Sequence, residues 1–344
     1  MIGVGRSAKD AIDQTRKAAA DAGITGESIR DAAKKTKDTA ADIARFGKRA
    51  ADSAIEAYTK SRGFAIEKLD YNGDGKVDIE DIIILSLKTP GVQIDRTKFL
   101  QKELFKNHPQ EMIDQAIAGT PAKAGIPREE IDKIADEVIN YERNCVSGIS
   151  TVLGMPGGLA MAATIPADII QYFGYTLRAA QKLLYLYGFP QIEIRDDGLN
   201  LDSETINQLT LCLGIMYGAA GAANAMKGIA KALASGVEKQ ILRKALTRGG
   251  LYPIVRNVAK WFGLKLTRKA FAGFFKNSIP VVGGIIGGGI TFASFKPCCS
   301  RLKSVLMDTM LSNPDHISDT EEEAIAESIL TESEEDREHS GTQE

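Results

Sequence analysis

The residues with the most specific chemistry lie in a stretch of twelve that is rich in aspartate, asparagine and glycine. Oxygen-bearing side chains recur there at alternate positions, and the stretch reads Asp70-Tyr-Asn-Gly-Asp-Gly-Lys-Val-Asp-Ile-Glu-Asp81. Carboxylate, amide and carbonyl oxygens are the ligands that calcium prefers in proteins. The predicted ligands are the side chains of Asp70, Asn72, Asp74, Asp78 and Asp81 and the backbone carbonyl of Lys76. The sequence therefore predicts a Ca²⁺ site, with Mg²⁺ as the alternative ion.

The spacing is that of an EF-hand loop, with Gly75 at the sharp turn and apolar residues on both flanks. One position departs from the pattern, because Asp81 stands where the last ligand is usually a glutamate. Its shorter arm reaches the ion less easily, which weakens calcium binding or shifts the preference toward magnesium. Loops that end in aspartate are the norm in dockerin modules, which the segment DYNGDGKVDIEDI also resembles. Dockerins carry two such loops and are exported. With one loop and no export signal in this sequence, no cohesin-binding role is expected.

The alternative interpretation of this stretch is a turn between helices that binds no ion. Four aspartate carboxylates converge within the twelve residues, and they would repel one another without a cation. The calcium interpretation is therefore favoured over the plain turn.

No arrangement of catalytic residues is evident in the sequence. Three histidines lie in a loop or in the tail: His108, His316 and His339. They suggest neither a zinc site nor a catalytic triad. The sequence contains no P-loop, nucleophile elbow or dinucleotide-binding fingerprint. An enzyme would need a site built from residues with weaker signals, such as Asp168, Tyr141 and Glu142.

The middle of the chain carries a long uncharged run, from Asn144 to Ala167. Glycine and proline at 154–158 interrupt it, and Pro166 can begin a new helix, where its missing N–H costs nothing. After Asp168, apolar residues recur at helical spacing, at Ile169, Phe173, Leu177, Ala180, Leu184 and Tyr187. We therefore expect two helices joined by a tight turn, the second of which buries an apolar face.

Two further runs, Thr205–Met226 and Asn277–Phe295, are also uncharged, and each is about as long as a bilayer span. Glycine and alanine dominate both runs, which suits close helix packing in a membrane bundle and in a soluble core equally well. Few large apolar residues are present. We therefore expect central helices of a soluble or peripheral bundle, with membrane spans as the alternative.

Several of these segments resemble the EcsC family of bacterial proteins, which is named for a gene next to an ABC transporter. The matching motifs are PGGLAMAATIPADIIQYFG from Pro156, YLYG from Tyr185, PVVGG from Pro280, NYE from Asn140 and YPIV from Tyr252. The resemblance extends from about Phe99 to about Lys303. It implies an association with transport, but it transfers no catalytic residues.

These features predict an all-α fold in three parts. Residues 1–92 form an amphipathic helical arm that carries the calcium loop, with small or apolar residues recurring every eleven positions between Ile29 and Tyr58. Residues 93–312 form a multi-helix bundle. Short helices are expected there at Thr97–Asn107, Gln110–Ala118 and Arg128–Glu142. Residues 313–344 form a disordered acidic tail.

The net charge of −2 hides a strong asymmetry along the chain. Between Lys227 and Lys276 there are twelve Lys or Arg and one acid, whereas thirteen acids and one base follow from Asp308 onward. Apolar residues recur every four positions from Ile229 to Ala245, so the basic segment 227–276 is expected to contact an anionic membrane. The tail is expected to fold back and compete for that surface. The aromatic residues of the segment are not spaced for base stacking, so no nucleic-acid partner is expected.

The remaining features concern location. Four cysteines show no disulfide framework, and the first twenty residues lack the apolar core of a signal peptide. We therefore expect a cytoplasmic protein that lies at the inner face of the membrane. Taken together, the sequence predicts a non-enzymatic, calcium-binding accessory protein with an unknown protein partner. The alternative is a soluble enzyme with an unrecognised site in the helical domain.

Overall fold

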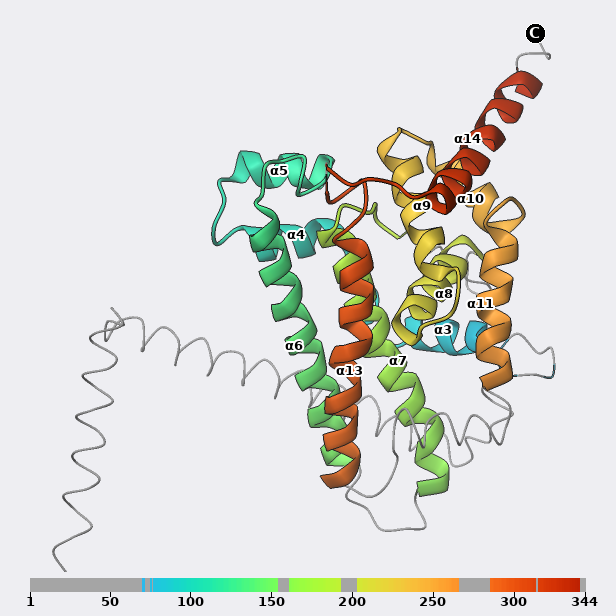
Figure 1. Cartoon of the computed structure of the whole chain (residues 1–344). Coiled ribbons are helices and arrows are strands. Elements are labelled where there is room, and N and C mark those ends of the chain that lie inside the picture. The colour runs from blue at the N-terminus through green and yellow to red at the C-terminus, as the bar shows by residue number, and fades with distance from the viewer. Residues whose placement is uncertain are drawn as a thin grey trace, which may run out of the picture. The chain divides into compact units, whose positions relative to one another are not determined.

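The computed structural model describes residues 70–71, 75, 77–153, 161–192, 203–265, 285–313 and 315–340. These residues form eleven helices and no strand, which confirms the predicted all-α fold (Figure 1). The helices are α3 (Ile79–Leu87), α4 (Arg96–Leu104), α5 (Gln110–Ala118), α6 (Arg128–Leu153), α7 (Met161–Leu186), α8 (Ser203–Tyr217), α9 (Ala222–Ala234), α10 (Lys239–Thr247), α11 (Tyr252–Lys265), α13 (Ile285–Leu306) and α14 (Thr320–Ser340). The part of the predicted arm that precedes residue 70 lies outside the described residues.

The helical domain is built around α8, which is buried along almost its whole length. It packs against α3, α7, α9, α10, α11 and α13. The long helices α6, α7 and α13 lie side by side and form one flank of the domain (Figure 1). The prediction that the run beginning at Thr205 forms a central helix of a bundle is therefore confirmed for α8.

The uncharged run from Asn144 leads into two helices, as expected. α6 ends at Leu153 and α7 begins at Met161, while residues 154–160 lie outside the described part. The expected start at Pro166 was wrong, since α7 begins about one turn earlier. A proline so near the start of a helix removes only one backbone hydrogen bond. The apolar positions predicted for this helix are all buried: Ile169, Phe173, Leu177, Ala180 and Leu184 on α7, and Tyr187 just after its end.

The run Thr205–Met226 supplies two helices rather than one span. Gly218 and Gly221 adopt φ values of +81° and +79°, the left-handed conformation that separates α8 from α9. Residues 277–284 of the third uncharged run lie outside the described part, and its remainder begins α13. Of the helices that the structure describes, none combines enough length and apolar character to serve as a bilayer span.

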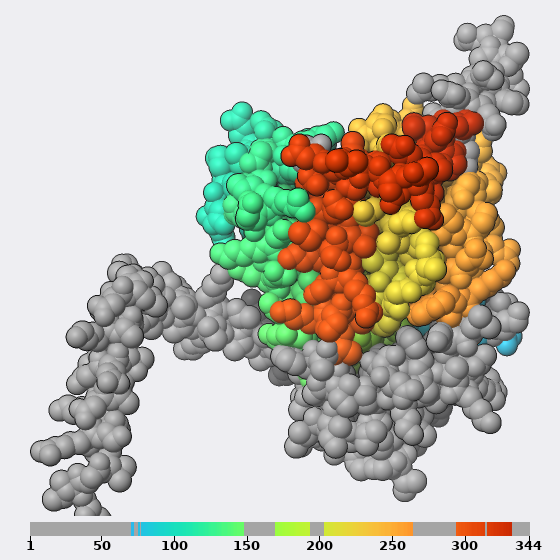
Figure 2. Space-filling model, in the orientation of Figure 1, coloured from blue at the N-terminus to red at the C-terminus, as the bar shows by residue number. Residues whose placement is uncertain are grey.

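The acidic tail differs from the predicted disorder, because residues 320–340 form α14. This helix packs on α9 and α10, and Figure 2 shows it (red) lying across α9 (yellow). Ala326 and Ile329 are buried, and the Glu322 amide donates a bond of 2.8 Å to Oδ1 of Asp319, which caps the helix. An N-terminal cap and a short apolar stripe are enough to stabilise a helix when the helix also packs on a neighbouring one. Charge composition alone hides both. The tail does lie on α9 and α10, whereas its expected competition with a membrane for the basic segment stays a prediction.

Candidate functional site

The described part of the predicted calcium loop contains the turn that an EF-hand requires. Gly75 adopts a φ of +81°, a conformation for which glycine is suited. Its amide donates a hydrogen bond of 2.8 Å to Oδ2 of Asp70, which joins the first predicted ligand to the sixth position of the loop. The predicted ligands Asn72, Asp74 and Lys76 lie outside the described residues.

The end of the loop is closed by Asp81, the residue that departs from the EF-hand pattern. Its Oδ1 accepts a bond of 2.8 Å from the Tyr71 amide, and its Oδ2 accepts one of 2.9 Å from the Asp78 amide. Asp78 caps α3, and its carboxylate accepts a bond of 2.8 Å from the Glu80 amide. Through these two bonds the fully buried Asp81 joins the second residue of the loop to the start of α3.

The chemistry of these residues fits a hard divalent cation. The side chains of Asp70, Asp78 and Asp81 supply carboxylate oxygens, which calcium and magnesium both prefer. Each such oxygen has two lone pairs, so an amide bond leaves it able to bind an ion as well. Within the described ranges, no group of three or more His, Cys, Asp or Glu side chains converges on one position. The fit therefore rests on the turn at Gly75 and on the donor chemistry.

Helix α3 joins the loop to the core of the domain. Ile79, Ile82, Ile83 and Leu87 are at most 1% exposed, and the helix packs against α7, α8 and α11. Ser86 Oγ donates a bond of 3.1 Å to the Ile170 carbonyl of α7. An ion that orders the loop would therefore act directly on a core helix.

The residues weighed for an enzyme lie apart from this loop in sequence. Tyr141 and Glu142 belong to α6, and the side chain of Asp168 lies outside the described part. Glu142 is fully buried, with Oε2 lying 3.0 Å from Nε of Arg178 and Oε1 lying 2.5 Å from Nζ of Lys182. The Lys182 ammonium also lies 5.4 Å from the centre of the Tyr141 ring. We call Glu142, Arg178 and Lys182 the buried ion cluster.

Charge pairing governs the electrostatics of the buried ion cluster. Burial alone would raise the pKa of Glu142, but Lys182 and Arg178 outweigh it and hold the pKa below its ordinary value of 4.5. Burial raises the pKa of the nearby Cys145 thiol to about 11, so this thiol stays protonated at neutral pH. These contacts suit a structural junction between α6 and α7. An enzyme that acts through Glu142 stays a prediction.

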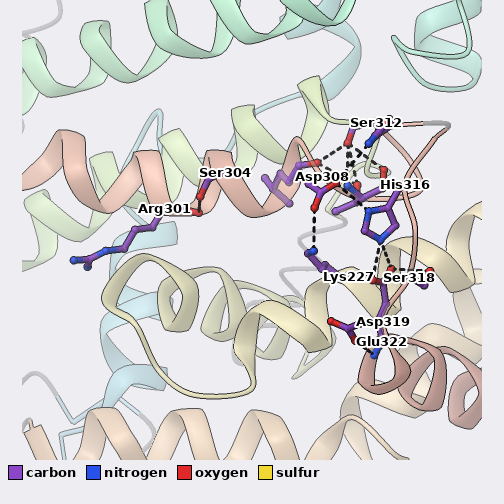
Figure 3. A network of polar contacts seen from close by, with 12 residues as sticks. Lys227, Arg301, Ser304, Asp308, Ser312, His316, Ser318, Asp319 and Glu322 are labelled. Carbon is purple, nitrogen blue, oxygen red and sulfur yellow. Dashed lines mark hydrogen bonds and ion pairs between the residues drawn. The ribbon is translucent and has the colours of Figure 1, made fainter.

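A second polar cluster, which we did not predict from the sequence, joins α14 to the chain after α13 (Figure 3). The side chain of His316 is 3% exposed, and its Nδ1 lies 3.0 Å from Oδ1 of Asp308. Its Nε2 lies 2.8 Å from Oε2 of Glu322, in the first turn of α14. Asp308 also pairs with Lys227 of α9 at 3.2 Å. We call Asp308, His316 and Glu322 the tail latch.

The tail latch favours a positively charged imidazole, because both ring nitrogens of His316 face carboxylates. Burial alone would lower the pKa of His316, but the bonds to Glu322 and Asp308 outweigh burial and raise it above 6.5. The same contact with His316 lowers the pKa of Asp308 to about 2. The stabilisation from His316 is therefore complete below pH 6.5, and it is lost as the pH rises through the raised value.

Replacing His316 by glutamine is expected to loosen α14, because Asp308 and Glu322 then lose the cation that they share. At pH 6, amide exchange in α14, corrected for intrinsic exchange, should be about tenfold faster in the variant. In the natural protein the protection of the α14 amides from exchange should fall as the pH rises past the raised pKa of His316. In the variant this pH-dependent fall should be absent. His108→Gln, which removes the contact to Glu130, is the control and should leave α14 unchanged. Equal exchange of α14 in the natural protein and His316→Gln at pH 6 would refute the latch.

Comparisons with protein-family models, with curated proteins and with solved structures gave no match to this chain. The resemblance to the EcsC family therefore stays a prediction that rests on sequence motifs. Two of those motifs contribute to the core: Glu142 of NYE belongs to the buried ion cluster, and Tyr187 of YLYG donates a bond of 2.7 Å to Asp132.

Proposed function

We propose that this protein is a non-enzymatic, calcium-binding accessory protein that acts next to a membrane. The observation that carries the proposal is the turn in the loop 70–81, where left-handed Gly75 donates to the carboxylate of Asp70. An EF-hand loop needs this turn at its sixth position to direct its ligands inward. A plain turn between helices does not need a run of aspartates around it.

The ion would be held by oxygen atoms of the loop and would act on the helical core. Asp70, Asn72, Asp74, Asp78 and Asp81 would supply side-chain oxygens, and Lys76 would supply its carbonyl. The bound cation neutralises the repulsion between the carboxylates and stabilises the closed loop. Since α3 follows the loop and is buried, calcium binding would stabilise the domain as a whole.

Membrane contact would come from the cations of segment 227–276. Lys239, Arg243, Arg256 and Lys260 are exposed on α10 and α11, and each cation near an anionic surface contributes about 1 kcal/mol. The apolar residues of α10 face the core, with Ile241, Leu242, Ala245 and Leu246 all buried. The contact would therefore be electrostatic rather than an insertion of apolar side chains. The resemblance to the EcsC family supports an association with transport.

Isothermal titration calorimetry tests the calcium site. The natural protein should bind about one calcium ion per chain, and Asp70→Ala should abolish binding, because it removes the first ligand and the acceptor for Gly75. Glu80→Gln is the matched control, since Glu80 is an exposed acid at a loop position that supplies no ligand. Asp81→Glu should raise the preference for calcium over magnesium, because the longer arm can bind the ion through both oxygens. An unchanged titration in Asp70→Ala would remove the site.

A further inference from the structure

Helix α14 fills a groove on α9 whose floor is Gly228. A Cβ atom added to Gly228 would lie 2.8 Å from Cβ of Ile325, closer than side chains approach in proteins. Ile325 therefore occupies the space that any other residue at position 228 would need. Its neighbours Ala326 and Ile329 are buried. The apolar stripe of α14 thus packs into the hole that the missing side chain of Gly228 leaves on α9.

Polar contacts on both sides of this hole select acidic residues. Asn224 Nδ2 donates a bond of 2.6 Å to Oε2 of Glu321, and Lys231 Nζ lies 3.2 Å from Oε1 of Glu323. Asn224, Gly228 and Lys231 follow one another at the spacing that places them on one face of a helix. The groove thus recognises two acids followed by an apolar stripe, which is a pattern that a helix from another protein can also carry.

We propose that this groove on α9 is a docking site for an acidic amphipathic helix of a partner protein, with α14 as its resident competitor. The occupant must be a helix rather than a lipid surface, because the hole at Gly228 and the spacing of Asn224 and Lys231 match side chains on one helix face. The partner helix competes with α14, which its covalent attachment keeps at a high effective concentration. The contacts of His316 with Asp308 and Glu322 in the tail latch stabilise α14 on α9. Loss of these contacts therefore favours binding of the partner helix. This interaction does not depend on calcium.

The test uses the full-length chain and a fluorescent peptide with the native sequence of residues 318–340. Ile325→Asp weakens the resident α14 and leaves the groove intact, so this variant should bind the peptide at least about tenfold more tightly than the natural protein. Adding Gly228→Val fills the hole and should return binding to the natural level. Ala324→Asp introduces the same charge at an exposed position of α14 and should leave peptide binding unchanged.

A charge exchange keeps the proposal testable if Gly228→Val does not fold. With Lys231→Glu added to Ile325→Asp, binding of the native peptide should be lost. Binding of a peptide that carries Glu323→Lys should be restored, because the charge pair is then reversed. Peptide binding to Ile325→Asp that equals that to Ala324→Asp would overturn the proposal, as would tight binding that survives Gly228→Val. The last measurement is binding to vesicles with and without anionic lipid. If Ile325→Asp binds anionic vesicles more tightly than the natural protein does but does not bind the peptide, the occupant of the groove is a membrane and the proposal is wrong.

Discussion

Replacing Glu142 by glutamine is expected to lower the free energy of unfolding by about 3–5 kcal/mol, among the largest effects of any single substitution in this domain. Glutamine has the same shape, so the change removes the charge without leaving a cavity. Arg178 and Lys182 would remain between α6 and α7 with side chains only 12% exposed and with no carboxylate between them. Both cations lie on α7, so without Glu142 of α6 they repel each other while desolvated, and the charge attraction that joins α6 to α7 is lost.

The pH dependence gives this prediction a second signature. Because the pKa of Glu142 lies below 4.5 in the folded protein, its contribution is present above pH 4.5 and is lost as the pH falls through the lower value. The Gln variant should lack this part of the acid destabilisation. Denaturant unfolding of both proteins at several pH values measures it. Asp136→Asn is the control, because Asp136 is 53% exposed in its pair with Lys303 and should change stability by less than about 1 kcal/mol. A Gln variant as stable as this control would refute the role of the buried ion cluster.

Replacing Arg96 by alanine is expected to cost about 4 kcal/mol, with the loss concentrated around α5. The Arg96 side chain is buried at the start of α4, and its Nε donates a bond of 3.0 Å to the Phe189 carbonyl. Its terminal nitrogens donate to the Ala116, Ile117 and Gly119 carbonyls, which lie at the end of α5. Alanine would leave four acceptors without this donor. The Arg96 guanidinium is further stabilised there because the C-terminal end of α5 carries the negative end of the helix dipole.

Arg96→Lys should recover only part of the loss, because an ammonium cannot reproduce the planar fork that reaches all these acceptors. Hydrogen exchange should show the fastest opening in α5, and denaturant unfolding should show the fall in stability. Lys98→Ala is the control, since Lys98 is 84% exposed in a surface pair and its loss should change stability by less than about 0.5 kcal/mol. If Arg96→Ala and Lys98→Ala proved equally stable, the four carbonyls would not depend on Arg96.

Much of the fold could be predicted because it depends on local patterns. The spacing of apolar residues marked the buried face of α7, and α5 has the predicted bounds of Gln110 and Ala118. The predicted helix Arg128–Glu142 continues to Leu153, because the uncharged residues after Glu142 still suit a helix. Glycine and proline marked the break between α6 and α7. In each case the deciding residues are close together in the chain.

The contacts that position the polar clusters could not be predicted, since they join residues that are far apart in sequence. Glu142 and Lys182 are separated by 40 positions, and Arg96 and Phe189 by 93. The tail illustrates a different failure. Its charge suggested disorder, but Ile325, Ala326 and Ile329 form a stripe that is too short to stand out in composition and is sufficient for docking once α9 offers the groove.

The proposed calcium site and its connection to the core are tested most directly by thermal unfolding with and without calcium. At a calcium concentration about a hundred times the dissociation constant, the midpoint of the natural protein should rise by roughly 5 °C over its value in a chelator. The rise should be absent in Asp70→Ala and preserved in Glu80→Gln. Equal midpoints of the natural protein with calcium and with chelator, or an equal rise in Asp70→Ala, would contradict calcium binding by the loop 70–81.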